Sequence, residues 1–205
     1  MKLITKITTI AFLAFSLSTS AQDNTRMDEI EAISKTAMAA CESGPQTIAD
    51  LDESMKQNAS LYTEYYKQDD YVVALNSWRP LFYSAPKYSQ NLHFRGAKMY
   101  KALAKKAEGE LKEAYLDTVL AINDVRIHCF GSSIKFEQSK AFDWYSYRSK
   151  GNDAFVYNLF DAVYKKHVAE KSENEADPTF LLFWAKSAVK ADKNAKAIDA
   201  AEVLD

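Results

Sequence analysis

A run of large apolar residues with helical spacing sets the strongest limit on how this chain can fold. Its members are Tyr71, Ala74, Leu75, Trp78, Leu81 and Phe82. Residues three and four apart lie on one face of an α-helix, so the spacing predicts an amphipathic helix that ends at Ala85, before Pro86. The chain has only 5 Gly and 4 Pro among 205 residues, which favours long helices over a turn-rich sheet. The sequence therefore predicts an all-α protein.

Similar spacing continues on both sides of this helix and predicts a row of helix hairpins. A first unit starts near Met55 and a second near Ser89, about 34 residues later, which is the period of a two-helix repeat. Later breaks are predicted at Gly131, at Gly151-Asn152 and at Pro178. The helix before Gly131 is expected to bury one stripe, made of Leu111, Ala114, Tyr115, Thr118, Ala121, Ile122, Val125 and Cys129.

The first unit resembles the tetratricopeptide repeat. The resemblance rests on the stretch from Tyr65-Tyr66 to Leu75, followed by Trp78, Leu81 and Pro86. It departs from the family at Asp69, where Gly is usual. The resemblance covers about residues 55–191 and implies a right-handed superhelix of helix hairpins, an α-solenoid with about three and a half repeats. In composition and signal style, the chain is also similar to exported repeat proteins of Bacteroidota.

The N-terminus has the layout of a secretory signal peptide. Lys2 and Lys6 precede a short apolar stretch from Ile10 to Leu17, and Thr19-Ser20-Ala21 offers small residues for cleavage. We therefore predict a signal peptide at residues 1–21, cleavage at Ala21/Gln22, and export to the periplasm or the extracellular space. The alternative is a buried N-terminal strand or helix.

The remaining boundaries follow from the same patterns. Residues 22–54 are predicted to be a capping segment with one helix at about Met27 to Cys41, and residues 55–192 the repeat domain. Residues 193–205 are predicted to be a C-terminal capping segment with apolar positions at Ile198, Ala201 and Leu204. No later apolar run approaches the roughly 20 residues that a membrane-spanning helix needs, so no transmembrane anchor is predicted.

Cys41 and Cys129 are the only cysteines. Disulfides persist outside the cytoplasm, so export favours a bond between these two cysteines. The alternative is a pair of small buried thiols on two helix faces.

No catalytic, metal-binding or cofactor-binding motif stands out, and we predict no enzyme activity, no metal and no cofactor. His93, His128 and His167 lie far apart in sequence, and each is expected to have a structural role. A formal net charge of -2 argues against nucleic acid, because phosphate binding needs a concentrated excess of Lys and Arg.

The tetratricopeptide resemblance implies that the first helix of each hairpin lines a concave groove. Carried onto this sequence, the exposed flank of the groove comprises Tyr66, Lys67, His93, Tyr100, Lys101, Tyr145 and Arg148. Tyr, Lys and Arg suit a polypeptide with acidic or C-terminal carboxylate groups; the alternative is an ordinary exposed helix flank. Thr63 and Ala97 stand where the family's chaperone-tail clamp has asparagines, so that narrower assignment is not supported.

These features together predict an interaction scaffold or adaptor of the cell envelope that binds a protein or peptide. One alternative is a small-ligand-binding or hydrolytic protein with a Tyr- and His-lined pocket. Another is the recognition subunit of a larger envelope assembly. A deep pocket with converging polar groups would favour the small-ligand alternative, whereas a scaffold predicts a long open groove.

Overall fold

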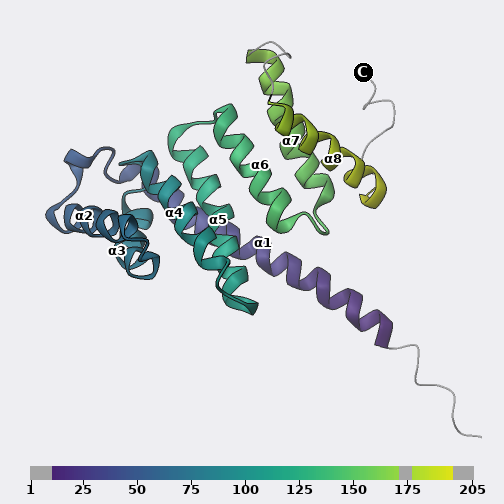
Figure 1. Ribbon diagram of the computed structural model, residues 1–205, viewed down its shortest axis with the longest axis horizontal. Coiled ribbons are helices and arrows are strands. Elements are labelled where there is room, and N and C mark those ends of the chain that lie inside the picture. The colour runs from purple at the N-terminus through teal and green to yellow at the C-terminus, as the bar shows by residue number, and fades with distance from the viewer. Residues whose placement is uncertain (1–10, 171–176, 196–205) are drawn as a thin grey trace, which may run out of the picture.

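A computed structural model describes residues 11–170 and 177–195, and all the regular secondary structure within them is helical (Figure 1). The helices are α1 (Ala11–Ser43), α2 (Glu53–Lys67), α3 (Tyr71–Ser84), α4 (Gln90–Ala104), α5 (Gly109–Phe130), α6 (Ile134–Arg148), α7 (Asp153–Glu170) and α8 (Pro178–Ala195), with a 3-10 turn at Ile48–Asp50. The predicted all-α class is confirmed. Parts of three predicted segments lie outside the described residues: residues 1–10 of the signal peptide, the linker at 171–176, and 196–205 of the C-terminal cap.

Short polar turns separate most of the helices, and local capping explains where several of them begin. Asp52, Asp70, Ser89 and Ser133 each accept a hydrogen bond from a backbone N–H in the first turn of the following helix. Gly131 ends α5 with a φ of 82°, and Gly151 turns the chain between α6 and α7 with a φ of 80°. The predicted start of a unit near Ser89 and the predicted breaks at Gly131 and Gly151 are therefore confirmed.

Consecutive helices pack as hairpins in a row. In Figure 1 the pairs α2–α3, α4–α5 and α6–α7 follow one another across the molecule, and α8 packs against α7 with a smaller contact to α6. Each hairpin contacts the next through α3 and α4 or through α5 and α6. This order matches the predicted succession of hairpins.

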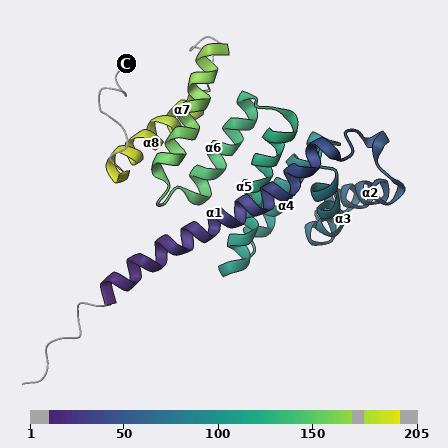
Figure 2. The same cartoon turned by 180° about the vertical axis from the view of Figure 1, so that it is seen from behind.

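Helix α1 departs from the sequential order because it crosses two hairpins. It packs against α5 and α3, and Figure 2 shows it lying across the row while its N-terminal end extends past the other helices. The predicted capping helix at Met27 to Cys41 is thus part of a longer helix, which runs without a break through residues 21 and 22. No helix among the described residues is both long enough and apolar enough to cross a membrane.

Helix α5 is buried on several sides, which corrects the prediction of a single buried stripe. Leu111, placed in that stripe, is 55% exposed, whereas Leu116, Val119 and Leu120 outside it are buried. The reason is that α5 contacts α4, α1 and α6, so no one face of the helix is reserved for solvent.

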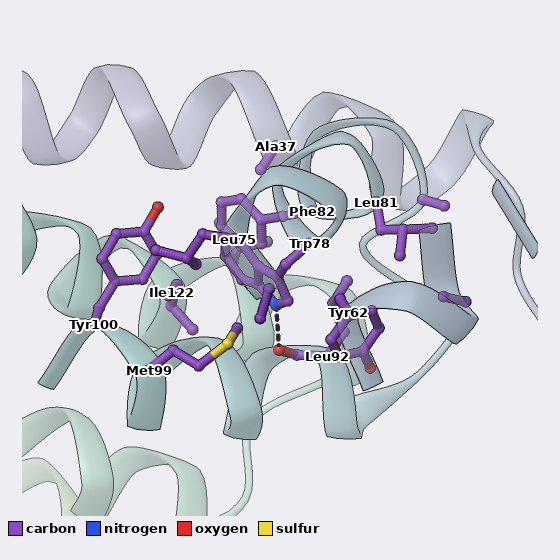
Figure 3. Close-up of a cluster of buried hydrophobic side chains, with 14 of the residues drawn as sticks. Ala37, Tyr62, Leu75, Trp78, Leu81, Phe82, Leu92, Met99, Tyr100 and Ile122 are labelled. Atoms are coloured by element: carbon purple, nitrogen blue, oxygen red, sulfur yellow. Dashed lines mark hydrogen bonds between the residues drawn. The ribbon is translucent and has the colours of Figure 1, made fainter. Parts of the chain in front are cut away.

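The first core lies between α1, α2, α3, α4 and α5 (Figure 3). Trp78 occupies its centre, stacks on Phe82 with ring centroids 4.6 Å apart, and donates its indole N–H to the Leu92 carbonyl at 2.8 Å. Gly96 faces this indole so closely that a Cβ atom would stand 2.2 Å from the ring. The small residue that the sequence places there is required by this contact.

A second core joins α5, α6, α7 and α8, with Ile30 of α1 at its edge. Its large rings meet mostly edge to face: Phe142 lies 5.4 Å from Phe160 and 5.3 Å from Phe183 between centroids. Such edge-to-face pairs are favoured by the charge distribution of aromatic rings.

Candidate functional site

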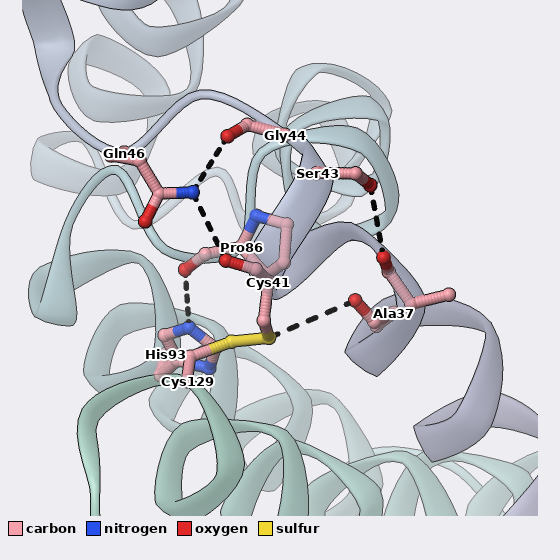
Figure 4. The surroundings of a disulfide bond; sticks show 9 residues. Ala37, Cys41, Ser43, Gly44, Gln46, Pro86, His93 and Cys129 are labelled. Atoms are coloured by element: carbon pink, nitrogen blue, oxygen red, sulfur yellow. Dashed lines mark hydrogen bonds between the residues drawn. A yellow bond between two sulfur atoms is a disulfide. The ribbon is translucent and has the colours of Figure 1, made fainter.

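A disulfide joins Cys41 of α1 to Cys129 of α5, with the two Cα atoms 5.2 Å apart (Figure 4). The predicted pairing is confirmed in the structure. The bond holds the C-terminal end of α1 on the end of α5, across a separation of 88 residues in sequence. A disulfide favours an oxidising compartment.

His93 lies beside this disulfide and is fully buried, so the prediction that it flanks an exposed groove is wrong (Figure 4). Its Nε2–H donates to the Pro86 carbonyl at 2.7 Å, and its ring sits between Phe82 and Phe130. Burial, with a smaller contribution from the charge of Arg126, lowers the pKa of His93 to about 4 despite the bond to Pro86. The imidazole is therefore a neutral part of the core at neutral pH.

Tyr100 is also buried and does not flank a groove. It packs edge-on against Trp78 with ring centroids 5.7 Å apart, and its hydroxyl accepts a hydrogen bond from Arg79 at 3.1 Å. Helix α4 contacts both α3 and α5, so it buries more of its circumference than its apolar stripe indicates. For this reason the sequence wrongly predicts His93 and Tyr100 to be exposed.

Arg148 serves a buried ionic network. Its Nε donates to Asp117 at 3.0 Å, it also contacts Asp117 through Nη2, and its Nη1 pairs with Glu113 at 2.9 Å. Arg26 of α1 approaches the other oxygen of Asp117 at 2.9 Å and pairs with Glu110. Asp117, whose side chain is 1% exposed, thus joins α1, α5 and α6.

Burial alone would lower the pKa of Arg26. Its hydrogen bonds to Asp117 and Glu110 outweigh that effect, so the pKa is raised and the guanidinium stays charged. Arg148 therefore has a structural role in this network and is not free to bind a partner.

Lys101 belongs to a second network between α4, α5 and α6. Its ammonium lies 2.6 Å from Asp143, which also accepts a hydrogen bond from Asn123 at 2.8 Å. Because the Lys101 side chain is still 35% exposed, it connects this buried pair to the surface.

Cations packed on aromatic rings connect the first helices of successive hairpins. Arg95 and Lys98 of α4 lie 5.3 and 5.2 Å from the ring centroid of Tyr66 on α2. Lys190 of α8 lies 4.3 Å from that of Tyr145 on α6. We call these five residues, with Lys101, Phe183 and Lys186, the first-helix surface. Lys67, by contrast, is exposed at the end of α2 and pairs loosely with Glu64 at 3.6 Å.

An open groove lies beside α1, with a volume of about 860 Å³. Helix α1 forms one wall, α6 and the start of α7 form the other, and α5 lies at the bottom. Its lining comprises Met27, Ile30, Glu31, Ser34, Lys35, Met38, Ala39, Glu42, Asp124, Ile127, His128, Lys140, Trp144 and Phe155. We call it the α1 groove. It contains one histidine and no tyrosine, so it is not the Tyr- and His-lined pocket of the small-ligand alternative.

Sequence reasoning identified Tyr66, Lys101 and Tyr145 on the first-helix surface but missed its other cations. The spacing of Arg95, Lys98 and Lys101 places them on one side of a helix and could have been noticed. Nothing local pointed to the α1 groove, because it depends on where α1 crosses the hairpins.

No protein-family model, curated protein or solved structure matches this chain. The tetratricopeptide resemblance therefore stays a prediction from the residues of the first unit. Among the described residues, no group of three or more His, Cys, Asp or Glu side chains is arranged to hold a metal ion.

Proposed function

We propose that this protein is an exported scaffold of the tetratricopeptide type, which binds an acidic stretch of a protein partner on the first-helix surface. The observation that carries the proposal is the excess of cations there: Arg95, Lys98, Lys186 and Lys190 all lie within 6 Å of an aromatic ring centroid. A ring holds the cation in place while leaving its N–H groups able to pair with a carboxylate.

The proposal includes the finer architecture that the resemblance implies, a right-handed solenoid whose first helices line a concave side. Contacts between alternate helices support it. Arg95 reaches the Thr63 hydroxyl on α2 at 3.1 Å, Lys101 reaches Asp143 on α6, and Phe183 of α8 packs 4.9 Å from Tyr145 between ring centroids. The signal-like N-terminus and the disulfide support export to the envelope or beyond.

A charge-reversal experiment tests the binding surface. A fluorescent ten-residue glutamate peptide serves as the probe, with a ten-residue lysine peptide as its counterpart. We expect the wild type to bind the acidic probe, and Lys98→Glu/Lys190→Glu to weaken that binding at least tenfold at low salt. Lys67 is exposed but lies outside the first-helix surface, so Lys67→Glu is the control and should change the affinity for the acidic probe little.

A crosslinking experiment in the native envelope then tests for a natural partner. A photoreactive phenylalanine replaces Tyr66 or Tyr145 on the surface and, as a control, Val72, which is 63% exposed on α3. The proposal expects a discrete crosslinked polypeptide at the first two positions only. Equal labelling at Val72, or none anywhere with the folded protein present, would contradict it.

A further inference from the structure

The α1 groove has a straight helical wall that runs along most of its length. Met27, Glu31, Ser34, Met38 and Glu42 line it at intervals of three or four residues, so they share one face of α1. From Met27 to Glu42 that face extends about 22 Å at 1.5 Å per residue. An open groove of this length beside a helix has the shape to receive a second helix.

Apolar side chains reach the surface inside this groove. Met27 is 36% exposed and Phe155 is 39% exposed, although both are large hydrophobic residues, and Met38 and Ile127 in the same lining are half-buried. Trp144, 2% exposed, packs 4.7 Å from Phe155 between ring centroids and supports that wall. Flexible methionines beside fixed rings suit the apolar stripe of an incoming helix.

Charges along the wall determine which helix fits. Glu31, Lys35 and Glu42 line the groove, and within the described part of the chain none of them belongs to an ion pair. Asp124 at the bottom of the groove and Lys140 on the opposite wall already pair with each other at 2.8 Å. The wall therefore presents the order negative, positive, negative to an occupant.

A second copy of this chain does not match that order. An antiparallel pair of α1 helices aligned over this stretch would set Glu31 of each copy against Glu42 of the other, and a parallel pair would set each charge against itself. Like charges in such positions are unfavourable. A helix with cations near both ends and an acid between them matches all three.

We infer that the α1 groove binds an amphipathic α-helix of a partner protein, with Lys or Arg at both ends of its apolar stripe. The inference does not rest on the proposed function, because the groove uses α1, α5, α6 and α7 and shares no residue with the first-helix surface. The protein would then hold two partners, or two parts of one partner, on separate surfaces.

The test uses two labelled 16-residue helical peptides with the same leucine stripe. One has Lys at both ends and Glu in the middle, and the other has these charges exchanged. Fluorescence anisotropy should show that the wild type binds the Lys-ended peptide about tenfold more tightly. The variant Glu31→Lys/Lys35→Glu/Glu42→Lys should prefer the Glu-ended peptide instead.

Two further variants locate the peptide in the groove. Met38→Glu should weaken the binding of both peptides. Glu108→Lys/Asp192→Lys reverses two exposed acids outside the groove and should leave the preference for the Lys-ended peptide unchanged. Circular dichroism and a thiol assay confirm that each variant is folded and keeps its disulfide. Absence of binding by the folded wild type, a preference that survives the charge exchange, or a concentration-dependent dimer that Met27→Glu dissociates would each overturn the inference.

Discussion

The two cores of this protein differ in whether their buried Trp and His side chains have hydrogen-bond partners. In the first core the indole N–H of Trp78 has an acceptor, the Leu92 carbonyl, and His93 uses one ring nitrogen on the Pro86 carbonyl. In the second core the indole N–H groups of Trp144 and Trp184 have no acceptor within the described residues, and neither ring nitrogen of His167 has a partner there.

This difference indicates which core has its side-chain geometry fixed by specific contacts. A buried polar group without a partner costs free energy, whereas one with a partner also fixes the geometry of its neighbours. The first core in addition contains the disulfide and the close contact of Gly96 with Trp78. We therefore expect the first core to be the more stable region, and the following predictions test or refine that expectation.

Removal of the disulfide should have the largest effect. In the chain-entropy model, closing a loop of this size stabilises the folded state by about 4 to 5 kcal/mol, so Cys41→Ser/Cys129→Ser should lose a comparable part of its free energy of unfolding. Urea unfolding measures the loss, and hydrogen exchange locates it. Protection should fall in α1, α3 and α5 more than in α7 and α8; an equal fall throughout would contradict the contrast between the cores.

Asp117→Ala should cost about 3 to 5 kcal/mol, because it leaves Arg26 and Arg148 buried without their shared carboxylate. The network joins α1, α5 and α6, so this change should loosen the contact between the cores. Chemical denaturation measures the cost. The triple variant Arg26→Met/Asp117→Leu/Arg148→Met should recover most of the lost free energy of unfolding. If it does not, the ion pairs themselves stabilise the fold beyond the packing of these side chains.

The stability of the first core should depend on pH through His93. Its pKa is lowered to about 4 in the folded protein, so between pH 6.5 and pH 4 the unfolded chain binds the proton more readily. The free energy of unfolding should therefore fall by about 3 kcal/mol as the pH drops through this window. His93→Gln can still donate a hydrogen bond to Pro86 but cannot bind this proton. Urea unfolding at several pH values should show that this variant lacks the fall in the free energy of unfolding between pH 6.5 and pH 4. The same fall in the variant would exclude His93 as its source.

The smallest predicted effect is the most direct comparison of the two cores. Trp78→Phe and Trp144→Phe remove the same atoms from sites that are 1% and 2% exposed, but only Trp78 loses a hydrogen bond. Trp78→Phe should therefore be more destabilising by about 1 kcal/mol, the net worth of a typical buried hydrogen bond. Equal losses in parallel thermal and urea unfolding would mean that the two indoles are equivalent.

Much of the fold could be predicted from local signals. The apolar spacing from Tyr71 to Phe82 and the turn at Gly131 each depend on a few neighbouring residues, and the structure confirms the helix ends that they predict. The start of a unit near Ser89, predicted from the repeat period, is confirmed by the first turn of α4. Pairing of the only two cysteines needed no knowledge of the fold. The site was predicted less well: Tyr66, Lys101 and Tyr145 belong to the first-helix surface, whereas His93 and Tyr100 are core residues and Arg148 is held by Asp117.

The sequence by itself determined the helices, their order and their turns, because hydrogen bonding and capping within a helix act over a few residues. Only the tertiary structure decided which sides of those helices stay exposed. The course of α1 across α3 and α5 buries α5 on several sides and creates the α1 groove. Such contacts join residues far apart in the chain, and apolar burial has no direction of its own, so spacing along one helix cannot show how many neighbours will cover it.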